Sequence, residues 1–229
     1  MSSRTFENSR VAKSLPSSRP LLLGHRGASK YARENTVAAF NLALQHGCDG
    51  FEFDVRYTRD SRAVICHNPF YRRRRIETHL FSESSPPCAD EVIGSFLGRA
   101  YLDIELKLQG QLQPILHALR AADRSRFVIS SFLPHVLEAV YAVAKHVPLG
   151  LICENAGQLR RWPSLPIHAL MIERKLATEA LLDELHSTGK QVFVWTVNRQ
   201  KEMLRLAELG VDGLISDDTL LLARTFNVQ

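Results

Sequence analysis

The feature that most constrains the fold is an alternation of short apolar segments with helical patterns. Most apolar segments precede a helical one, and this order implies parallel strands, because parallel neighbours need a crossover connection. Eight such units in 229 residues predict one α/β domain, a closed (β/α)8 TIM barrel. An open sheet of six or seven strands is the alternative. The strand centres are Leu21, Phe51, Leu102, Val128, Leu149, Leu170, Phe193 and Leu214.

The domain is expected over residues 20–229, after a flexible polar tail over residues 1–19. The tail lacks the apolar run of a signal peptide, and no later stretch approaches the ~20 apolar residues of a membrane span. Four cysteines lack the close spacing of a zinc site or a redox motif: Cys48, Cys66, Cys88 and Cys153. We therefore expect a cytoplasmic protein, and its oligomeric state is left open.

Residues 62–67 suggest a short strand beside the main sheet, and residues 68–99 then show no convincing apolar period. This stretch contains the arginine run Arg72–Arg75 and the pair Pro86-Pro87. Loops of such length are usually functional or disordered. We expect a short irregular insertion after the second strand.

The second strand carries two carboxylates on an apolar background. Because strand side chains alternate, Glu52 and Asp54 share one face, while Phe51 and Phe53 share the other. A buried carboxylate must be paired, protonated or bound to a cation, and a hard divalent metal meets that need. An edge strand whose acids face water is the alternative for this segment taken alone.

Other strands also end in polar residues. His25 follows the first strand, His67 ends the short strand after the second, and Glu105 and Lys107 end the third. Catalytic groups of a TIM barrel gather at the carboxyl ends of its strands. Acids, bases and cations from separate pieces of chain are thus expected at one rim.

These residues resemble the signature of the glycerophosphodiester phosphodiesterases, a family of phospholipase-C-like phosphodiesterases, over nearly the whole chain from residue 20. The family has a TIM barrel, in agreement with the strand count. The amino-terminal matches are His25-Arg26-Gly27, Glu34-Asn35-Thr36, Ala39-Phe40, Gly50, Glu52, Asp54-Val55, Thr58, Asp60 and His67. Later matches are residues 103–107, 130–132, 195–198 and 210–213, with Asp217.

The resemblance implies metal-dependent hydrolysis of glycerophosphodiesters to glycerol 3-phosphate and an alcohol by two-histidine acid/base catalysis. The implied roles are Mg²⁺ or Ca²⁺ binding by Glu52, Asp54 and Glu105, acid and base catalysis by His25 and His67, phosphate binding by Arg26 and Lys107, a pocket wall from Trp195, and hydrogen-bond support from Glu34. One of these roles has an alternative: Glu34 can instead be an acid with no part in the site, placed near a helix N-terminus because the helix dipole favours negative charge there.

The chain departs from the family pattern at two places, which leaves its choice of substrate open. Asn68 stands where relatives usually have an aspartate after the second histidine, and the insertion is shorter and less regular. A phosphodiesterase of lysophospholipids would use the same catalytic set. A pseudoenzyme that only binds phosphorylated ligands would be expected to lose a histidine or a carboxylate, and none is lost.

The net charge of +5 favours anionic partners, of which we expect a small phosphodiester substrate. Nucleic acid is not expected, since Arg72–Arg75 has no recognised binding module around it. The run is either a solvated loop or a funnel that steers phosphorylated substrates or makes a weak contact with acidic membranes. Its residues are Arg72, Arg73, Arg74 and Arg75.

Overall fold

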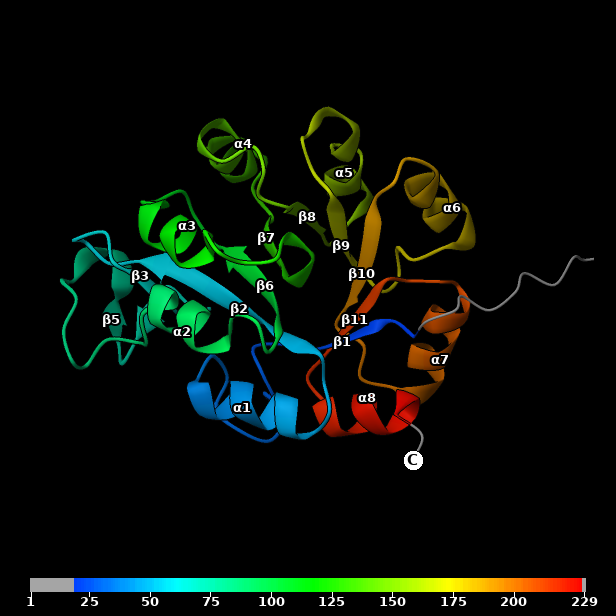
Figure 1. Cartoon of the computed structure of the whole chain (residues 1–229), viewed down its shortest axis with the longest axis horizontal. Helices are drawn as coiled ribbons and strands as arrows, with labels where there is room; N and C mark the ends of the chain where they lie inside the picture. Colours follow the sequence, from blue (N-terminus) through cyan, green and yellow to red (C-terminus); the bar gives the residue numbers. More distant parts are fainter. Residues whose placement is uncertain (1–18, 228–229) are drawn as a thin grey trace, which may run out of the picture.

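The computed structural model describes residues 19–227, which form a closed (β/α)8 barrel (Figure 1). Neighbouring barrel strands are parallel, and β1 pairs with both β11 and β2, which closes the ring. This confirms the predicted fold, and each of the eight residues predicted as strand centres lies within a barrel strand. The predicted flexible tail lies outside the described residues except for Arg19. The strands are β1 (Leu21–Gly24), β2 (Gly50–Tyr57), β6 (Tyr101–Leu106), β7 (Phe127–Ser131), β8 (Leu149–Cys153), β9 (Ala169–Glu173), β10 (Gln191–Trp195) and β11 (Gly213–Ser216).

The helices surround the barrel in sequence order (Figure 1). Thr36 caps α1 by accepting a hydrogen bond from the Ala39 amide at 3.2 Å. No helix within residues 19–227 is long and apolar enough to cross a lipid bilayer. The α-helices are α1 (Val37–Gln45), α2 (Ala89–Phe96), α3 (Gln113–Leu119), α4 (Pro134–Val143), α5 (Ala156–Leu159), α6 (Glu179–Ser187), α7 (Gln200–Glu208) and α8 (Thr219–Phe226), and short 3-10 helices are η1 (Ile76–Thr78), η2 (Arg124–Arg126) and η3 (Trp162–Ser164).

Apolar side chains pack in two layers, one between strands and helices and one inside the barrel. In the outer layer, Phe51 stacks on Phe40 with ring centroids 4.2 Å apart and meets the edge of Phe96 at 4.9 Å. Inside the barrel, Tyr101 and Phe193 lie 5.7 Å apart. Since side chains alternate along β2, the carboxylates of Glu52 and Asp54 share the face opposite Phe51, as predicted, and this face is the barrel interior.

A short antiparallel strand, β3 (Ala63–Ile65), returns beside β2 and pairs Ile65 with Val55. The Cys66 amide then donates to the Asp54 carbonyl at 2.9 Å. The next residue, His67, is thereby placed beside the two acids of β2. The predicted strand next to the main sheet is confirmed.

The irregularity expected for residues 68–99 is wrong in part. The chain forms a hairpin of β4 (Phe70–Tyr71) and β5 (Arg74–Arg75), then η1, and later helix α2. The buried residues of α2 follow the helical spacing i, i+3, i+4, i+7, but this helix has only eight residues and no side-chain cap, so its pattern is short. These residues are Ala89, Val92, Ile93 and Phe96.

Candidate active site

A cavity of about 210 Å³ opens at the carboxyl ends of the barrel strands. Of the nine predicted site residues, Asp54 lies beneath its lining with no exposed surface, and Glu34 reaches it from the rim through Arg26. The barrel thus brings all nine together, although their positions span most of the chain. The other seven line the cavity: His25, Arg26, Glu52, His67, Glu105, Lys107 and Trp195.

Three carboxylates from two neighbouring strands form the floor of the site. The register of β2 and β6 sets Asp54 beside Glu105, and each of the three acids is at most 6% exposed. One oxygen from each of Glu52, Asp54 and Glu105 lies within 4.8 Å of the others. Three oxygen donors at this separation are the ligand set that Mg²⁺ and Ca²⁺ prefer.

Two cations compensate part of this buried charge. Lys107 Nζ lies 2.7 Å from Asp54 Oδ1 and 2.5 Å from Glu105 Oε1, and Arg26 Nε lies 3.3 Å from Asp54 Oδ2. Burial favours the neutral acid, but the nearby lysine and arginine charges outweigh it and lower the pKa of Asp54. For Glu105 burial dominates and raises the pKa.

Glu52 is the acid that the protein leaves least compensated. Its Oε2 accepts a hydrogen bond from the Arg26 amide at 2.9 Å, but its buried Oε1 has no hydrogen-bond partner. Burial, followed by the charges of Asp54 and Glu105, raises the pKa of Glu52 well above its ordinary value. An unpartnered buried carboxylate oxygen in an all-oxygen donor set fits a hard divalent cation, so these residues suit the metal that the sequence predicted.

The backbone at Arg26 is left-handed, with φ of +56°. This conformation costs energy for a residue with a side chain and occurs where the surrounding structure enforces it, commonly at functional sites. Here it directs the amide at Glu52. The guanidinium meanwhile donates to Glu34 Oε2 at 2.9 Å, so Glu34, which is partly exposed, orients the arginine at the rim.

His25 is held by a carboxylate from the far end of the chain. Its Nδ1 lies 2.7 Å from Asp217 Oδ1, and Asp217 also accepts from Ser29 Oγ at 3.1 Å and Asn198 Nδ2 at 2.7 Å. Burial opposes ionisation of Asp217, but these hydrogen bonds and the nearby histidine lower its pKa to about 2. An ionised carboxylate only accepts, so His25 donates from Nδ1. Its Nε2, 4.0 Å from Glu52 Oε2, is the atom that serves the cavity.

His67 has a neutral partner instead. Its Nδ1 lies 3.2 Å from Asn68 Oδ1, and its carbonyl accepts from Arg56 Nε at 2.9 Å. The same arginine pairs with Glu77 at 2.9 Å, which ties the histidine to η1. Burial lowers the pKa of His67; the charge of Asp54 opposes this and that of Arg26 adds to it, and the net shift is downward, so the ring is neutral at neutral pH.

An aromatic wall faces the charged floor. Trp195 is fixed by its Nε1–H, which donates to the Met171 carbonyl at 3.0 Å, and by edge contact with Phe132, 5.7 Å away. Lys107 Nζ lies 5.8 Å from the centre of the Phe132 ring. The cavity therefore has one polar face for an anion and one apolar face for carbon atoms.

Sequence reasoning gave no role in the site to four residues that the structure places there. Asn35 donates to Asp54 Oδ2 at 2.7 Å, and the buried Asp103 accepts from Ser130 Oγ at 2.6 Å. Burial raises the pKa of Asp103 to about 7. The other two are Phe132 and Asp217. Each lies within a matched motif, but Asp217 contacts His25 across 192 positions of sequence, a pairing that no local pattern reveals.

A family model and an individual relative of this chain both come from the same family of phosphodiesterases. The model of the glycerophosphoryl diester phosphodiesterase family matches residues 25–75 and 96–221. A glycerophosphodiester phosphodiesterase from Caldanaerobacter subterraneus is 29% identical over 86% of this chain and 94% of its own.

Solved structures share the fold. A putative glycerophosphoryl diester phosphodiesterase from Silicibacter pomeroyi superposes with a TM-score of 0.80 at 21% identity, covering 93% of this chain and 94% of its own. An Oleispira antarctica phosphodiesterase, solved with the product sn-glycerol-3-phosphate, gives 0.79 at 22% identity, covering 92% and 98%.

Proposed function

Because the chain belongs to the glycerophosphoryl diester phosphodiesterase family and is a phosphodiesterase, we propose that it hydrolyses glycerophosphodiesters to glycerol 3-phosphate and an alcohol with a divalent metal ion. The observation that carries this proposal is a cavity lined by His25, His67 and two of three clustered buried carboxylates, with the third, Asp54, directly beneath. Glu52, Asp54 and Glu105 would hold Mg²⁺ or Ca²⁺. The product bound to the Oleispira antarctica relative supports the product proposed here.

The phosphodiester anion needs positive charge around it before a nucleophile can approach. A bound divalent ion supplies Lewis acidity and charge neutralisation. Arg26 and Lys107 point into the same cavity, and their fixed N–H donors can hold phosphate oxygens more strongly as negative charge develops on them. Both side chains are already oriented by acids, Arg26 by Glu34 and Lys107 by Glu105, so they bind without losing further freedom.

The two histidines have different partners, which supports different roles. His67, whose pKa is lowered by burial, is neutral and can accept a proton from the water whose oxygen forms the new bond to phosphorus. His25, protonated on both ring nitrogens, then gives its Nε2 proton to the alkoxide oxygen whose bond to phosphorus breaks, while Asp217 holds Nδ1–H and fixes the ring. Asn68 cannot offer His67 a charged acceptor, which favours the neutral ring that a base requires.

The aromatic wall supports a small substrate. A cavity of about 210 Å³ suits a glycerol and a phosphate group, with the carbon chain of glycerol against Trp195 and Phe132. A lysophospholipid would have to leave its acyl chain outside. We therefore place glycerophosphodiesters ahead of lysophospholipids.

A panel of substrates tests the proposal. Glycerophosphocholine, glycerophosphoethanolamine and lysophosphatidylcholine are incubated with the protein, and glycerol 3-phosphate and free alcohol are measured after chelation and after return of Mg²⁺ or Ca²⁺. We expect glycerol 3-phosphate only when metal is present. Full activity after exhaustive chelation would show that the reaction needs no metal. Faster hydrolysis of the lysolipid than of the glycerophosphodiesters would show that lysophospholipids are the substrates.

We also propose a cytoplasmic setting, where thiols stay reduced. The four cysteines are free in the structure, and burial raises the pKa of both Cys48 and Cys153 to about 12, so these two thiols are unreactive at neutral pH. Thiol counting on protein taken directly from cells tests this. Titration of fewer than four thiols after denaturation would contradict it.

A further inference from the structure

The segment from Phe70 to Phe81, which we call the rim segment, exposes large apolar side chains. Phe70 is 57% exposed, Leu80 63% and Phe81 36%. Within residues 19–227 only seven large apolar residues are exposed, and three of them lie in these twelve positions. Grouped apolar exposure of this kind marks a surface that meets another phase or partner.

The same segment places arginines in a turn that disfavours them. Tyr71 pairs with Arg74, so Arg72 and Arg73 form a two-residue hairpin turn, and their φ angles are +47° and +63°. Two positive φ angles define a type I′ turn, in which Asn-Gly is the usual sequence. Two arginines here cost backbone energy, so a role for their charges outside the hairpin would explain their presence.

The arginine charges are largely uncompensated by the protein. Arg75 pairs with Glu77 at 3.2 Å, whereas Arg72, Arg73 and Arg74 make no ion pair within residues 19–227. Four arginines and one glutamate give the rim segment a formal charge of +3. It is thus both cationic and apolar.

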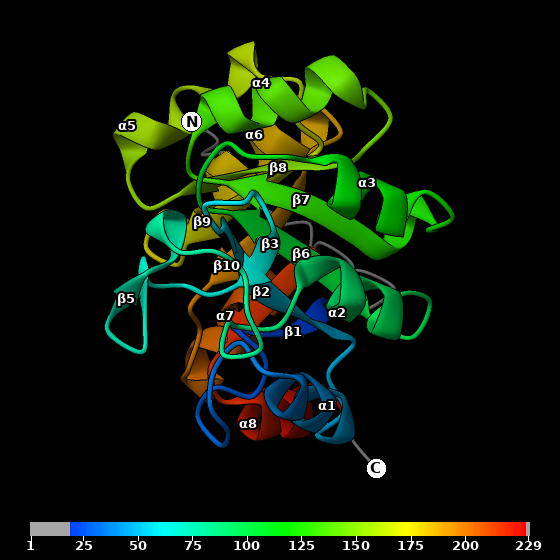
Figure 2. The ribbon, with the colours of Figure 1, turned by 90° about the vertical axis from the view of Figure 1, so that its left-hand side faces the viewer.

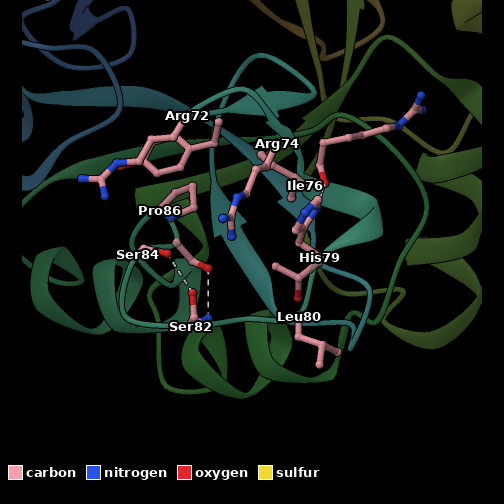
Figure 3. Close-up of a pocket in the computed structure, with 12 residues that line it drawn as sticks. Arg72, Arg74, Ile76, His79, Leu80, Ser82, Ser84 and Pro86 are labelled. Atoms are coloured by element: carbon pink, nitrogen blue, oxygen red, sulfur yellow. Dashed lines mark hydrogen bonds between the residues drawn. The ribbon is translucent and has the colours of Figure 1, made fainter.

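A cavity of about 310 Å³ lies against the hairpin (Figure 3). Figure 3 shows Arg74 extending into it, with Ser82 and Ser84 on one side and His79 on the other. A guanidinium beside hydroxyl and imidazole groups provides N–H and O–H donors, from which the oxygens of a phosphate group can accept hydrogen bonds. Leu80 also lines this cavity, and 63% of its surface stays exposed to solvent.

The rim segment borders the active site. A groove beside the hairpin is lined by Tyr71 and Arg72 together with Glu34 and His67. Arg33, in the loop between β1 and α1, places its guanidinium 5.4 Å from the centre of the Tyr71 ring. Figures 1 and 2 both show β5 at the outer edge of the molecule, so the hairpin can contact a surface outside the protein while the barrel stays clear of it.

We propose that the rim segment docks the mouth of the active-site cavity on a bilayer that contains anionic phospholipids. Its arginines meet the headgroup phosphates, one of which enters the cavity beside Arg74, and its exposed phenylalanine and leucine side chains enter the interface. A small soluble anion would account for the arginines but not for the exposed Phe70 and Leu80. Charge and apolar surface together match an acidic membrane surface.

Vesicle sedimentation in the presence of a chelator, without substrate, tests the proposal. We expect binding to phosphatidylcholine vesicles that contain phosphatidylserine, little binding to phosphatidylcholine alone, and loss of binding as salt screens the charges. Changing Arg72, Arg73, Arg74 and Arg75 to glutamine should weaken the partition coefficient roughly 100- to 1000-fold. The pair Phe70→Ser and Leu80→Ser should also weaken it at unchanged charge.

A matched variant controls for net charge. Arg120, Arg124, Lys145 and Arg205 are exposed and precede β7, β8 and β11, at the opposite end of the barrel, so changing these four to glutamine removes the same charge. This variant should keep most of the vesicle binding. Equal loss in both quadruple variants would overturn the proposal, as would a wild-type protein that stays in the supernatant at low salt or binds only inorganic phosphate.

The outcome is separable from the proposed hydrolysis. All variants should keep the wild-type kcat on a soluble glycerophosphodiester, and their thermal unfolding shows whether they fold. A protein that hydrolyses the soluble substrate but ignores vesicles refutes only the docking. One that binds vesicles without hydrolysing any diester refutes only the activity.

Discussion

Replacing Glu52 by glutamine should stabilise the metal-free protein and remove its response to metal. The carboxylate is 4% exposed, and its Oε1 has no partner. Glutamine keeps the shape and can still accept from the Arg26 amide, but it carries no charge. The variant therefore separates the cost of a buried charge from the benefit of binding a cation.

The sign follows from the raised pKa of Glu52. Between its ordinary value of 4.5 and its folded value, the folded state binds more protons than the unfolded state, so stability falls as pH rises through that window. One such group contributes a slope of at most about 1.4 kcal/mol per pH unit. Asp103, with a pKa raised to about 7, and Glu105, also raised, act in the same direction, so the variant should lose only part of the wild-type slope.

Metal should reverse this loss in the wild-type protein. A cation at about 100 times its Kd stabilises by about 2.7 kcal/mol. For a chain of this length each kcal/mol moves Tm by about 2–4 °C, so Mg²⁺ or Ca²⁺ should raise Tm by roughly 5–10 °C. Glu52→Gln should show little of this shift.

Thermal unfolding of both proteins from about pH 6 to about pH 8, in chelator and then in excess Mg²⁺ or Ca²⁺, measures both effects. Glu154→Gln, at an exposed acid on the cavity rim, is the matched control and should keep the wild-type slope and metal response. The reasoning fails if Glu52→Gln is less stable than wild type in chelator at the upper pH. It also fails if metal stabilises the variant as much as the wild type.

The remaining predictions concern the proton-transfer groups. His25→Ala and His67→Ala should each lower kcat by roughly 10²-fold or more, whereas the exposed His146→Ala should not change it; steady-state kinetics with a soluble diester decides. Because burial lowers the pKa of His67 from 6.5, the acid limb of the wild-type pH profile should lie below about 6.5, and the profile of His67→Ala should lack this limb. Asp217→Asn should lower kcat by roughly 10²-fold and distort the pH profile with little change in KM, because an amide can hold His25 in the wrong tautomer. An unchanged profile would show that Asp217 does not orient the ring. Since the pKa of Asp217 is depressed to about 2, its contribution to stability should be lost only as pH falls from 3.8 toward 2, which acid titration followed by circular dichroism checks.

The sequence by itself determined the barrel, and it predicted nine residues that the barrel brings to one candidate site. Side chains along a strand alternate in direction with a period of two, which is a local property, so the face that Glu52 and Asp54 share can be read without knowing their neighbours. Parallel strands of a closed barrel all end at one rim, so the polar residues after β1, β2 and β6 had to meet there. The residues that end a strand were therefore the predictable ones.

Only the tertiary structure decided the partners and charge states of those residues. The contact of His25 with Asp217 joins the first and last barrel strands, and it exists because β1 and β11 are neighbours when the ring closes. The left-handed backbone of Arg26 and the orphaned oxygen of Glu52 likewise depend on packing around them. Helix α2 was missed because eight residues give a weak periodic signal, whereas packing of Phe96 against Phe51 stabilises the helix in the fold.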